Sequence, residues 1–379
     1  MPYRIGFVQI HRRGPLRQLA IVLGLSLLCM LTLGQHVSAQ TLQIDKIADG
    51  LDEPWAIGFL PGGDVLVTER DGALLRLPAK GGAPTRVAGV PEVAATGQGG
   101  LLDVMVTRDF VQTRRIWLSY AAAVKGGAGT SAGFGYLSTD GTRLEDFRAV
   151  IAPVGHRGGR HFGARLVEAL DGTVFLTTGD RGQDDLAQRL DGPEGKVLHF
   201  SAEGMPLTAA EFAGRGDVWA GLYSYGHRNI QGATLDDTGR LLTVEHGARG
   251  GDEVNAPAPG RNYGWPVISY GRNYIGTKIG EGRAKPGMEQ PLHYWDPSIA
   301  PSGLMVYSGD LFPDWGGHMF TGSLNSDLIS RLDPAQGYVE ARIAAEETAR
   351  VRDIRQAPDG SIWFLSVIEG AIYKLSPAR

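Results

Sequence analysis

The residues that could do chemistry in this chain lie far apart in the sequence, beside apolar segments. They are an amide side chain, a histidine, several cations and a group of oxygen donors: Gln98, His161, Arg228, Asn229, the segment Glu245 to Glu253, Asn325, Arg350 and Arg352. Arginine presents a fixed fork of donors that matches carboxylates, and carboxylates and carbonyls are the ligands that calcium takes. Brought together, such a set would suit a polyanionic ligand, a hard metal ion and a general base.

Each of these residues also has an ordinary explanation. A lone histidine is more often a structural hydrogen-bonding residue, and an acidic pair such as Asp252-Glu253 is usually solvated. Alternation in Arg350-Val351-Arg352 predicts that both guanidinium groups lie on one side of a strand, where ordinary surface ion pairs are the alternative. The spacing alone leaves these alternatives open.

Six segments share a pattern that would position these residues: an apolar stretch, a turn that often carries Asp-Gly, and an alternating apolar strand. They are Trp55 to Arg70, Leu101 to Tyr120, Phe162 to Asp180, Asn229 to Glu245, Ser302 to Leu324 and Arg352 to Ser366. Period-two alternation bounded by Gly, Pro and Asp predicts a β-hairpin in each segment. A unit that recurs at tens of residues without burying its own apolar face is typical of a repeat array.

Six units of irregular spacing predict an all-β fold, a six-bladed β-propeller, in which closure of the ring removes the exposed sheet edges. The strand from Leu42 to Ile47 is expected to complete the blade that ends at Ile372 to Leu375. A propeller gathers one loop per blade around its axis, so the scattered polar residues would converge there. A pair of β-sandwiches, which also use short strands, is the alternative.

The N-terminal segment, residues 1–39, has the features of a secretory signal peptide. A basic stretch that contains Arg12 and Arg13 precedes the apolar run Leu19 to Leu33, and Val37-Ser38-Ala39 fits a cleavage site. The apolar run is about fifteen residues long, whereas a membrane-spanning helix needs about twenty, which disfavours the alternative of a retained anchor. Residues 40–379 would then form the propeller domain of a periplasmic or secreted protein without a membrane span.

Composition excludes several classes of function for residues 40–379. The segment has 33 basic and 41 acidic residues and a net charge of −8, because the leader holds four of the 37 basic residues and no acidic one. This sign argues against a nucleic-acid partner, whose phosphates require a basic surface. The single cysteine, Cys29, lies in the leader, which excludes disulfides, a thiolate nucleophile and a cysteine-ligated metal from the remainder.

Six longer motifs occur in a fixed order along the chain. They are GQGGLLDV (Gly97 to Val104), HFGARL (His161 to Leu166), YGHRNIQG (Tyr225 to Gly232), EHGARGGDEVN (Glu245 to Asn255), NYGWP (Asn262 to Pro266) and RVRDI followed by PDG (Arg350 to Gly360). In this order they resemble the soluble PQQ-dependent aldose sugar dehydrogenases of the glucose/sorbosone dehydrogenase family. The resemblance covers essentially all of residues 40–379 and implies a six-bladed propeller that uses PQQ and calcium.

The resemblance also implies an activity and the residues that bind the cofactor. Aldose sugars would be oxidised at the anomeric carbon to the lactone, with hydride passing to PQQ and electrons then to an external acceptor. His161 matches the family's catalytic base, and Arg228 matches a residue that stabilises the charge developing on the quinone. The cofactor contacts implied by position are Gln98, Arg228, Asn229, Tyr274, Arg350 and Arg352.

The metal sites are implied in the same way. Backbone carbonyls of Gly247 and Ala248 fall where the family binds the catalytic calcium, and Glu253 and Tyr263 match a second, structural calcium site. Asn325 stands where many members have a lysine that pairs with the cofactor, so one cation contact is missing or replaced.

The residues near the expected substrate also depart from the family pattern. Arg160 and Asp185 replace an acid and a glutamine of the glucose-specific members, so their sugar specificity is not transferable. Two other functions stay open: a calcium-dependent hydrolase of the lactonase kind, and a non-catalytic binding propeller. A hydrolase of the lactonase kind would not need three arginines that bind carboxylates.

Overall fold

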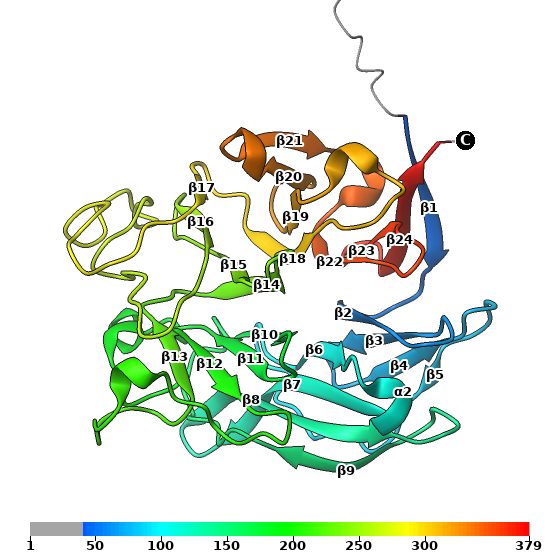
Figure 1. Cartoon of the computed structure of the whole chain (residues 1–379), viewed down its shortest axis with the longest axis horizontal. Coiled ribbons are helices and arrows are strands. Elements are labelled where there is room, and N and C mark those ends of the chain that lie inside the picture. Colours follow the sequence, from blue (N-terminus) through cyan, green and yellow to red (C-terminus); the bar gives the residue numbers. More distant parts are fainter. Residues whose placement is uncertain (1–40, 379) are drawn as a thin grey trace, which may run out of the picture. The chain divides into compact units, whose positions relative to one another are not determined.

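The computed structural model describes residues 41–378, and these residues form six four-stranded antiparallel sheets. Figure 1 shows the first strand of each sheet near a common centre. These inner strands contact one another in the order β2, β6, β10, β14, β18 and β22, and β22 contacts β2, which closes the ring. The predicted six-bladed β-propeller is confirmed. The predicted signal peptide, residues 1–39, lies outside the described residues.

The first three blades follow one another along the chain. Blade 1 contains β2 (Pro54–Phe59), β3 (Val65–Glu69), β4 (Leu74–Leu77) and β5 (Thr85–Arg86). Blade 2 contains β6 (Leu101–Val106), β7 (Arg115–Val124), β8 (Gly127–Leu137) and β9 (Leu144–Ala149). Blade 3 contains β10 (Gly163–Glu168), β11 (Val174–Thr178), β12 (Lys196–Phe200) and β13 (Leu222–Tyr225).

The last three blades continue the same order until the ring closes. Blade 4 contains β14 (Ile230–Leu235), β15 (Leu241–Glu245), β16 (Asp252–Asn255) and β17 (His293–Trp295). Blade 5 contains β18 (Pro301–Val306), β19 (Met319–Ser323), β20 (Ile329–Asp333) and β21 (Val339–Ile343). Blade 6 contains β22 (Val351–Gln356), β23 (Ile362–Ser366), β24 (Ala371–Pro377) and β1 (Leu42–Ala48). As predicted, β1 pairs antiparallel with β24 and so joins the two ends of the described chain.

Helices in the described residues are short. They are α2 (Phe110–Thr113) and the 3-10 turns η1 (Asp184–Gln188), η2 (Ala210–Phe212), η3 (Pro313–Trp315), η4 (Pro334–Gln336) and η5 (Glu346–Thr348). No helix within residues 41–378 has the length and apolar character needed to cross a membrane.

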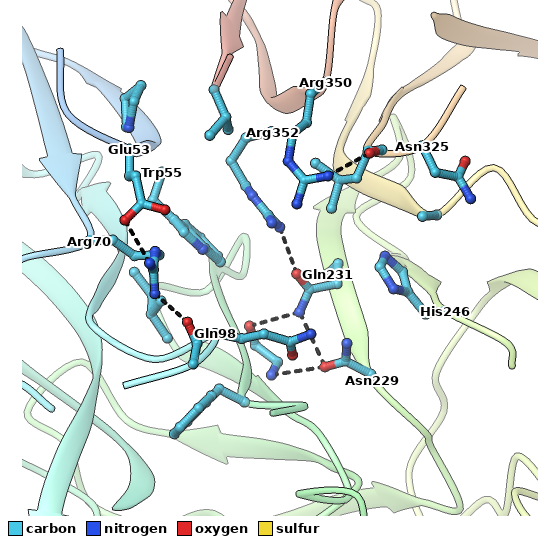
Figure 2. A pocket seen from close by; sticks show the side chains of 18 residues that line it. Glu53, Trp55, Arg70, Gln98, Asn229, Gln231, His246, Asn325, Arg350 and Arg352 are labelled. Carbon is cyan, nitrogen blue, oxygen red and sulfur yellow. Dashed lines mark hydrogen bonds and ion pairs between the residues drawn. The ribbon is translucent and has the colours of Figure 1, made fainter. Parts of the chain in front are cut away.

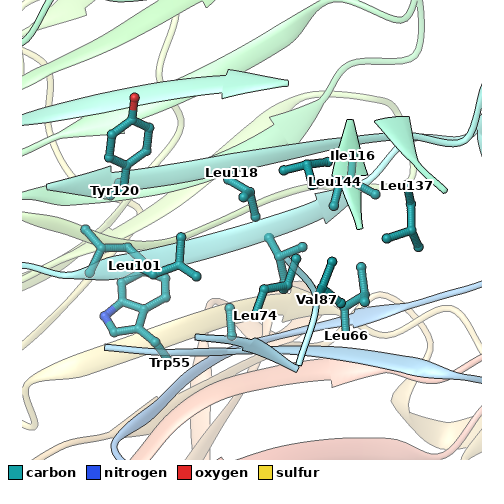
Figure 3. Packing of buried hydrophobic residues seen from close by; sticks show 14 of the residues in the cluster. Trp55, Leu66, Leu74, Val87, Leu101, Ile116, Leu118, Tyr120, Leu137 and Leu144 are labelled. Atoms are coloured by element: carbon teal, nitrogen blue, oxygen red, sulfur yellow. The ribbon is translucent and has the colours of Figure 1, made fainter. Parts of the chain in front are cut away.

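The blades are held together by apolar side chains between neighbouring sheets. Figure 3 shows Trp55, Leu66 and Leu74 of blade 1 facing Leu101 and Leu118 of blade 2, and all five are buried. Successive side chains of a strand point to opposite faces, and here each face packs on another blade, so the inner strands are apolar almost throughout. Each fully buried leucine contributes about 1.5–3 kcal/mol to the stability of the ring.

Every inner strand has a shift in register against the second strand of its blade. The shifts fall between Pro54 and Ala56, Leu101 and Val104, Gly163 and Leu166, Ile230 and Gly232, Pro301 and Leu304, and Val351 and Asp353. A bulge bends its strand and re-aims the adjacent side chains. All six bulges lie at the start of the inner strand, so the residues around these six strand starts are directed toward one end of the ring axis.

Candidate active site

A cavity of about 310 Å³ lies where the six inner strands begin. Five of the residues singled out from the sequence line it, namely Gln98, Asn229, Asn325, Arg350 and Arg352. They come from the loops before β6, β14 and β22, from the start of β22 itself and from the loop after β19. Figure 2 shows their side chains around the cavity. The expected convergence of residues from different blades is therefore observed, in a cavity of the size that binds small cofactors.

Two arginines of this cavity lie on β22 or directly before it. Arg350 donates from Nη1 to the Leu324 carbonyl (2.8 Å), and Arg352 donates from Nη1 to Gln231 Oε1 (2.8 Å). Val351 between them is buried on the opposite side, as alternation predicted. Burial lowers the pKa of Arg352 to about 9, with a further contribution from the nearby guanidinium groups of Arg165 and Arg350.

Arg228 is a third cation beside the cavity. Its guanidinium is buried, lies 5.1 Å from the centre of the Trp265 ring and donates from Nη1 to the His246 carbonyl (3.3 Å). Its Nε has no partner within the described residues. None of Arg228, Arg350 and Arg352 forms an ion pair with a carboxylate of residues 41–378. Three positive charges are thus left for an anionic ligand.

His161 is not among the residues that line the cavity, but it contacts Gln98 and directly precedes Phe162, which both line it. The backbone N–H of His161 donates to Gln98 Oε1 (2.7 Å), and its Nδ1 lies 2.6 Å from Asp180 Oδ1. Asp180 is fully buried and accepts a second hydrogen bond from Trp265 Nε1 (2.8 Å). The carboxylate therefore holds the proton on Nδ1 and leaves Nε2 as the basic nitrogen. The backbone N–H of Asp180 donates to the Arg228 carbonyl (2.8 Å), which ties the histidine to the arginine.

Several residues at the starts of the inner strands adopt left-handed backbone conformations. The φ angles of Glu53, His161, Ala300 and Arg350 are 43°, 53°, 49° and 50°. Such a conformation costs a residue with a side chain roughly 1–2 kcal/mol. Strain of this kind concentrates at functional sites, where the surrounding structure enforces it. Here it directs the side chain of His161 toward Asp180 and that of Arg350 into the cavity.

Four residues of the cavity, Glu53, Trp55, Arg70 and Gln231, were not predicted from the sequence, and His246 was included only as part of the segment Glu245 to Glu253. His246 Nε2 donates a hydrogen bond to the Pro301 carbonyl (2.8 Å). Burial, and after it the positive charge of Arg228, lowers the pKa of His246 to about 3. The imidazole is therefore neutral and presents Nδ1 as an acceptor. Trp55 and Gln231 stand within predicted hairpins, where an aromatic or an amide gives no signal of a site.

Comparisons with known proteins agree with this geometry. The family defined as "Glucose / Sorbosone dehydrogenase" matches residues 51–374. The chain belongs to this dehydrogenase family. It is 39% identical to the aldose sugar dehydrogenase YliI of Escherichia coli (strain K12) over 346 residues, which cover 89% of this chain and 93% of that protein.

Solved structures of the family show the same fold. The apo-form of the soluble aldose sugar dehydrogenase from Escherichia coli is 40% identical, with a TM-score of 0.82 over 89% of this chain and all of that chain. The PQQ-bound form of aldose sugar dehydrogenase from Streptomyces coelicolor is 26% identical, with a TM-score of 0.72 over 89% of this chain and 98% of that one.

Two of the metal-binding positions implied by the family resemblance, Gly247 and Ala248, lie in a second cavity of about 610 Å³. Tyr274 also lines it, and His246 and Asn325 line both cavities. No hydrogen bond between residues 41–378 uses the Gly247 carbonyl oxygen. A Cβ at this position would collide with the Gly250 carbonyl, so the fold of the loop requires glycine. The carbonyl is free to hold a cation beside the first cavity.

Asp252 has a structural role in this loop. Its Oδ1 accepts from Gly247 N (2.8 Å), and its Oδ2 accepts from Ser298 Oγ, Ile299 N and Ala300 N at 2.7–2.9 Å. With both oxygens engaged, Asp252 fixes the loop rather than offering a ligand. Its neighbour Glu253 is the carboxylate of this pair that remains available as a metal ligand.

Glu253 is partly buried and lies beside Glu245, which is buried. Asn255 Nδ2 donates to both, at 3.1 Å to Glu253 Oε2 and 3.0 Å to Glu245 Oε1, and Asn255 Oδ1 is buried without a partner in the described residues. Burial, followed by the charge of Glu245, raises the pKa of Glu253 to about 8. An unpaired amide oxygen beside two carboxylates fits a cation, although residues 41–378 hold no group of three or more His, Cys, Asp or Glu arranged for a metal.

Tyr263, the other residue implied for the structural metal, has its hydroxyl occupied. It donates to Ala256 O (2.5 Å) and accepts from Ala258 N (3.0 Å), and its ring stacks on His227. Only its backbone carbonyl could therefore serve a cation.

Proposed function

We propose that this chain is an exported dehydrogenase that uses PQQ and calcium to oxidise aldose sugars at the anomeric carbon to the lactone. The observation that carries the proposal is the set of three arginines without carboxylate partners, Arg228, Arg350 and Arg352, beside one cavity of the described fold. PQQ bears three carboxylates and a quinone, so its negative charge complements the positive charge of these arginines. The PQQ-bound relative from Streptomyces coelicolor supports the choice of ligand.

The cofactor would be held by residues from four segments of the chain. Arg350 and Arg352 would bind its carboxylates, and Arg228 its quinone carbonyl. Gln98, Asn229 and Tyr274 would complete the contacts. When bound, PQQ supplies the acceptor for the hydride that leaves the anomeric carbon.

The chain's own groups would move the proton and stabilise charge. His161 Nε2 would accept the proton of the anomeric hydroxyl as the hydride leaves, and Asp180 stabilises the imidazolium through Nδ1. Arg228 would stabilise the negative charge that develops on the reduced carbonyl. Calcium at the carbonyls of Gly247 and Ala248 would add to this field. Glu253 and the Tyr263 carbonyl would hold a structural calcium.

Export is part of the same proposal. Residues 1–39 would direct residues 40–379 to the periplasm or the medium, where an external acceptor takes the electrons onward. A bound cofactor suits that compartment, because the reaction then needs no diffusible nicotinamide.

Reconstitution tests the proposed function. Purified apoprotein supplied with PQQ and calcium is expected to reduce a dye when an aldose is added and to give the absorption spectrum of the reduced cofactor. A lactonase-like hydrolase would act on lactones without PQQ, and a binding propeller would take up sugar without turnover. Either of these results would overturn the proposal.

Replacing Arg352 by methionine should weaken PQQ binding about 10- to 100-fold, because a charge-assisted hydrogen bond contributes about 1.5–3 kcal/mol. Titration of the apoprotein with PQQ, followed by tryptophan fluorescence, measures the change. Arg342→Met is a matched control, since Arg342 is exposed and pairs with Glu340 on the outer strand of blade 5. Equal affinities for the wild type and Arg352→Met would contradict the assignment.

Calcium should stabilise the apoprotein through Glu253 and its neighbour Glu245. At a calcium concentration about 100-fold above Kd, binding to the folded state alone contributes about 2.7 kcal/mol, seen as a rise in Tm. Glu253→Gln should remove most of this rise, whereas Glu92→Gln, at an exposed position before β6, should keep it. An unchanged calcium effect in Glu253→Gln would place the structural ion elsewhere.

A further inference from the structure

A further polar pocket lies beside the segment that ends at His161. It is formed by the two loops that carry the histidine and its carboxylate, residues 155–160 before β10 and residues 181–183 after β11. Three arginines line it, Arg157, Arg160 and Arg181, and no carboxylate does. We call it the arginine pocket.

Arg181 supplies a buried positive charge at this pocket. Only 3% of the residue is exposed, and its guanidinium lies 3.3 Å from the centre of the Phe162 ring. Burial lowers the pKa of Arg181 to about 10, so the group stays charged at neutral pH. Its Nη1 donates to Arg160 O, while Nε has no partner within residues 41–378. No carboxylate of the described chain lies within ion-pair distance of it.

The other two cations of the pocket are exposed. Neither Arg157 nor Arg160 forms an ion pair or a side-chain hydrogen bond with the described residues. The acidic groups behind the pocket are already engaged: Asp180 binds His161 and Trp265, and Glu194 binds His156 Nε2 at 2.7 Å. The residues that line the pocket therefore carry three guanidinium groups and no carboxylate. Asp180 and Glu194 act on Arg181 from behind the pocket, and Asp184 and Asp185 follow its second loop without lining it.

The arginine pocket lies next to His161, the residue expected to contact the anomeric hydroxyl of the sugar. Arg160 is the residue before His161, and Arg181 N donates to the His161 carbonyl (3.3 Å). An aldose whose anomeric hydroxyl reaches His161 would extend its far end over the adjoining loops. Guanidinium groups bind carboxylate or phosphate through paired hydrogen bonds, and more strongly than they bind neutral hydroxyls.

We propose that the arginine pocket is an anion subsite for the substrate, so that the preferred aldoses carry a carboxylate or phosphate remote from the anomeric carbon. This inference rests on the proposed function and gives it a substrate class. Hexuronic acids and aldose phosphates are the two sources of such a group. The distant anion anchors the sugar and leaves the anomeric carbon at His161.

The test compares charged and neutral sugars on the reconstituted holoenzyme. D-glucuronate and glucose 6-phosphate are expected to give higher kcat/KM than D-glucose, and whichever of the two is preferred identifies the anion. In Arg157→Gln/Arg160→Gln, the ratio of kcat/KM for the preferred anionic sugar to that for D-glucose should fall about 10- to 100-fold, as expected for lost charge-assisted hydrogen bonds. The loss should appear mainly in KM, because the anchor binds ground and transition states alike. Lys80→Gln, an exposed cation of blade 1, should leave the ratio unchanged.

Binding of D-glucuronate, glucose 6-phosphate and D-glucose to the PQQ-loaded protein, measured by calorimetry, gives a second reading that does not need turnover. Tighter binding of either anionic sugar, lost in the double variant, supports the subsite. Equal kcat/KM for charged and neutral sugars, or an unchanged ratio in the double variant, would overturn it while leaving the dehydrogenase proposal intact. Binding without any oxidation of any aldose would overturn the dehydrogenase proposal instead.

Discussion

Replacing His161 by alanine is expected to lower kcat for aldose oxidation by about 10²- to 10⁴-fold, the usual contribution of a positioned general base. The physical reason is the histidine tautomer that Asp180 fixes. Its carboxylate holds the ring proton on Nδ1, so Nε2 is left to receive the proton of the sugar hydroxyl. The arginines that would bind PQQ are on other blades and keep their contacts, so cofactor affinity should stay near that of the wild type.

Steady-state kinetics and PQQ titration on the same preparation measure the two quantities separately. His199→Gln is the control, because His199 lies on β12 of the same blade and stacks on Phe175 away from the cavity. Equal loss of turnover and of PQQ binding in His161→Ala would mean that the histidine holds the cofactor rather than the proton.

Much of the fold could be predicted because its strongest signals are local. Each of the six hairpins is the inner pair of strands of a blade, and these strands are buried on both faces, so their apolar character is nearly continuous. The outermost strands could not be predicted in the same way. The two residues of β5, Thr85 and Arg86, are both exposed and give no apolar pattern. These two residues form a strand only because they pair with β4, and no pattern in their own sequence encodes that pairing.

The site was predictable only in part for a similar reason. Alternation is sufficient to place Arg350 and Arg352 on one side of a strand, and the cavity receives both. The contact between Asp180 and Trp265 joins positions 85 residues apart, and no local rule connects them. The left-handed backbone of His161 likewise has no signature in its residue type, because the register shift of blade 3 imposes it.

Arg165 occupies the centre of the ring and connects five of its blades. It lies on β10 and is 1% exposed, with Nε on Gln231 O (2.7 Å) and Nη2 on Arg352 O (3.0 Å). Its Nη1 lies 3.3 Å from Asp103 Oδ1 and 2.9 Å from Asp353 Oδ1, and its guanidinium stacks 4.1 Å from the Trp55 ring centre. Through Gln231 and Arg352 this group also supports the lining of the cavity.

Arg165→Met should therefore lower the free energy of unfolding by about 3–5 kcal/mol, because it leaves two buried carboxylates with less compensation. Arg355 also contacts both, at 2.8 and 2.9 Å, and so limits the loss to that range. Chemical denaturation measures the change, and Arg148→Met, at an exposed position of β9, should change stability by less than about 0.5 kcal/mol.

The double variant Arg165→Met/Asp103→Asn separates charge from packing. Neutralising Asp103 removes part of the uncompensated charge, so the double variant should be more stable than Arg165→Met alone if the ion pairs account for the loss. A further loss on adding Asp103→Asn would instead assign the stability to the hydrogen bonds of Asp103 with Leu166 N and Val104 N. A change of less than about 1 kcal/mol in Arg165→Met would show that the apolar contacts between blades close the ring without this central group.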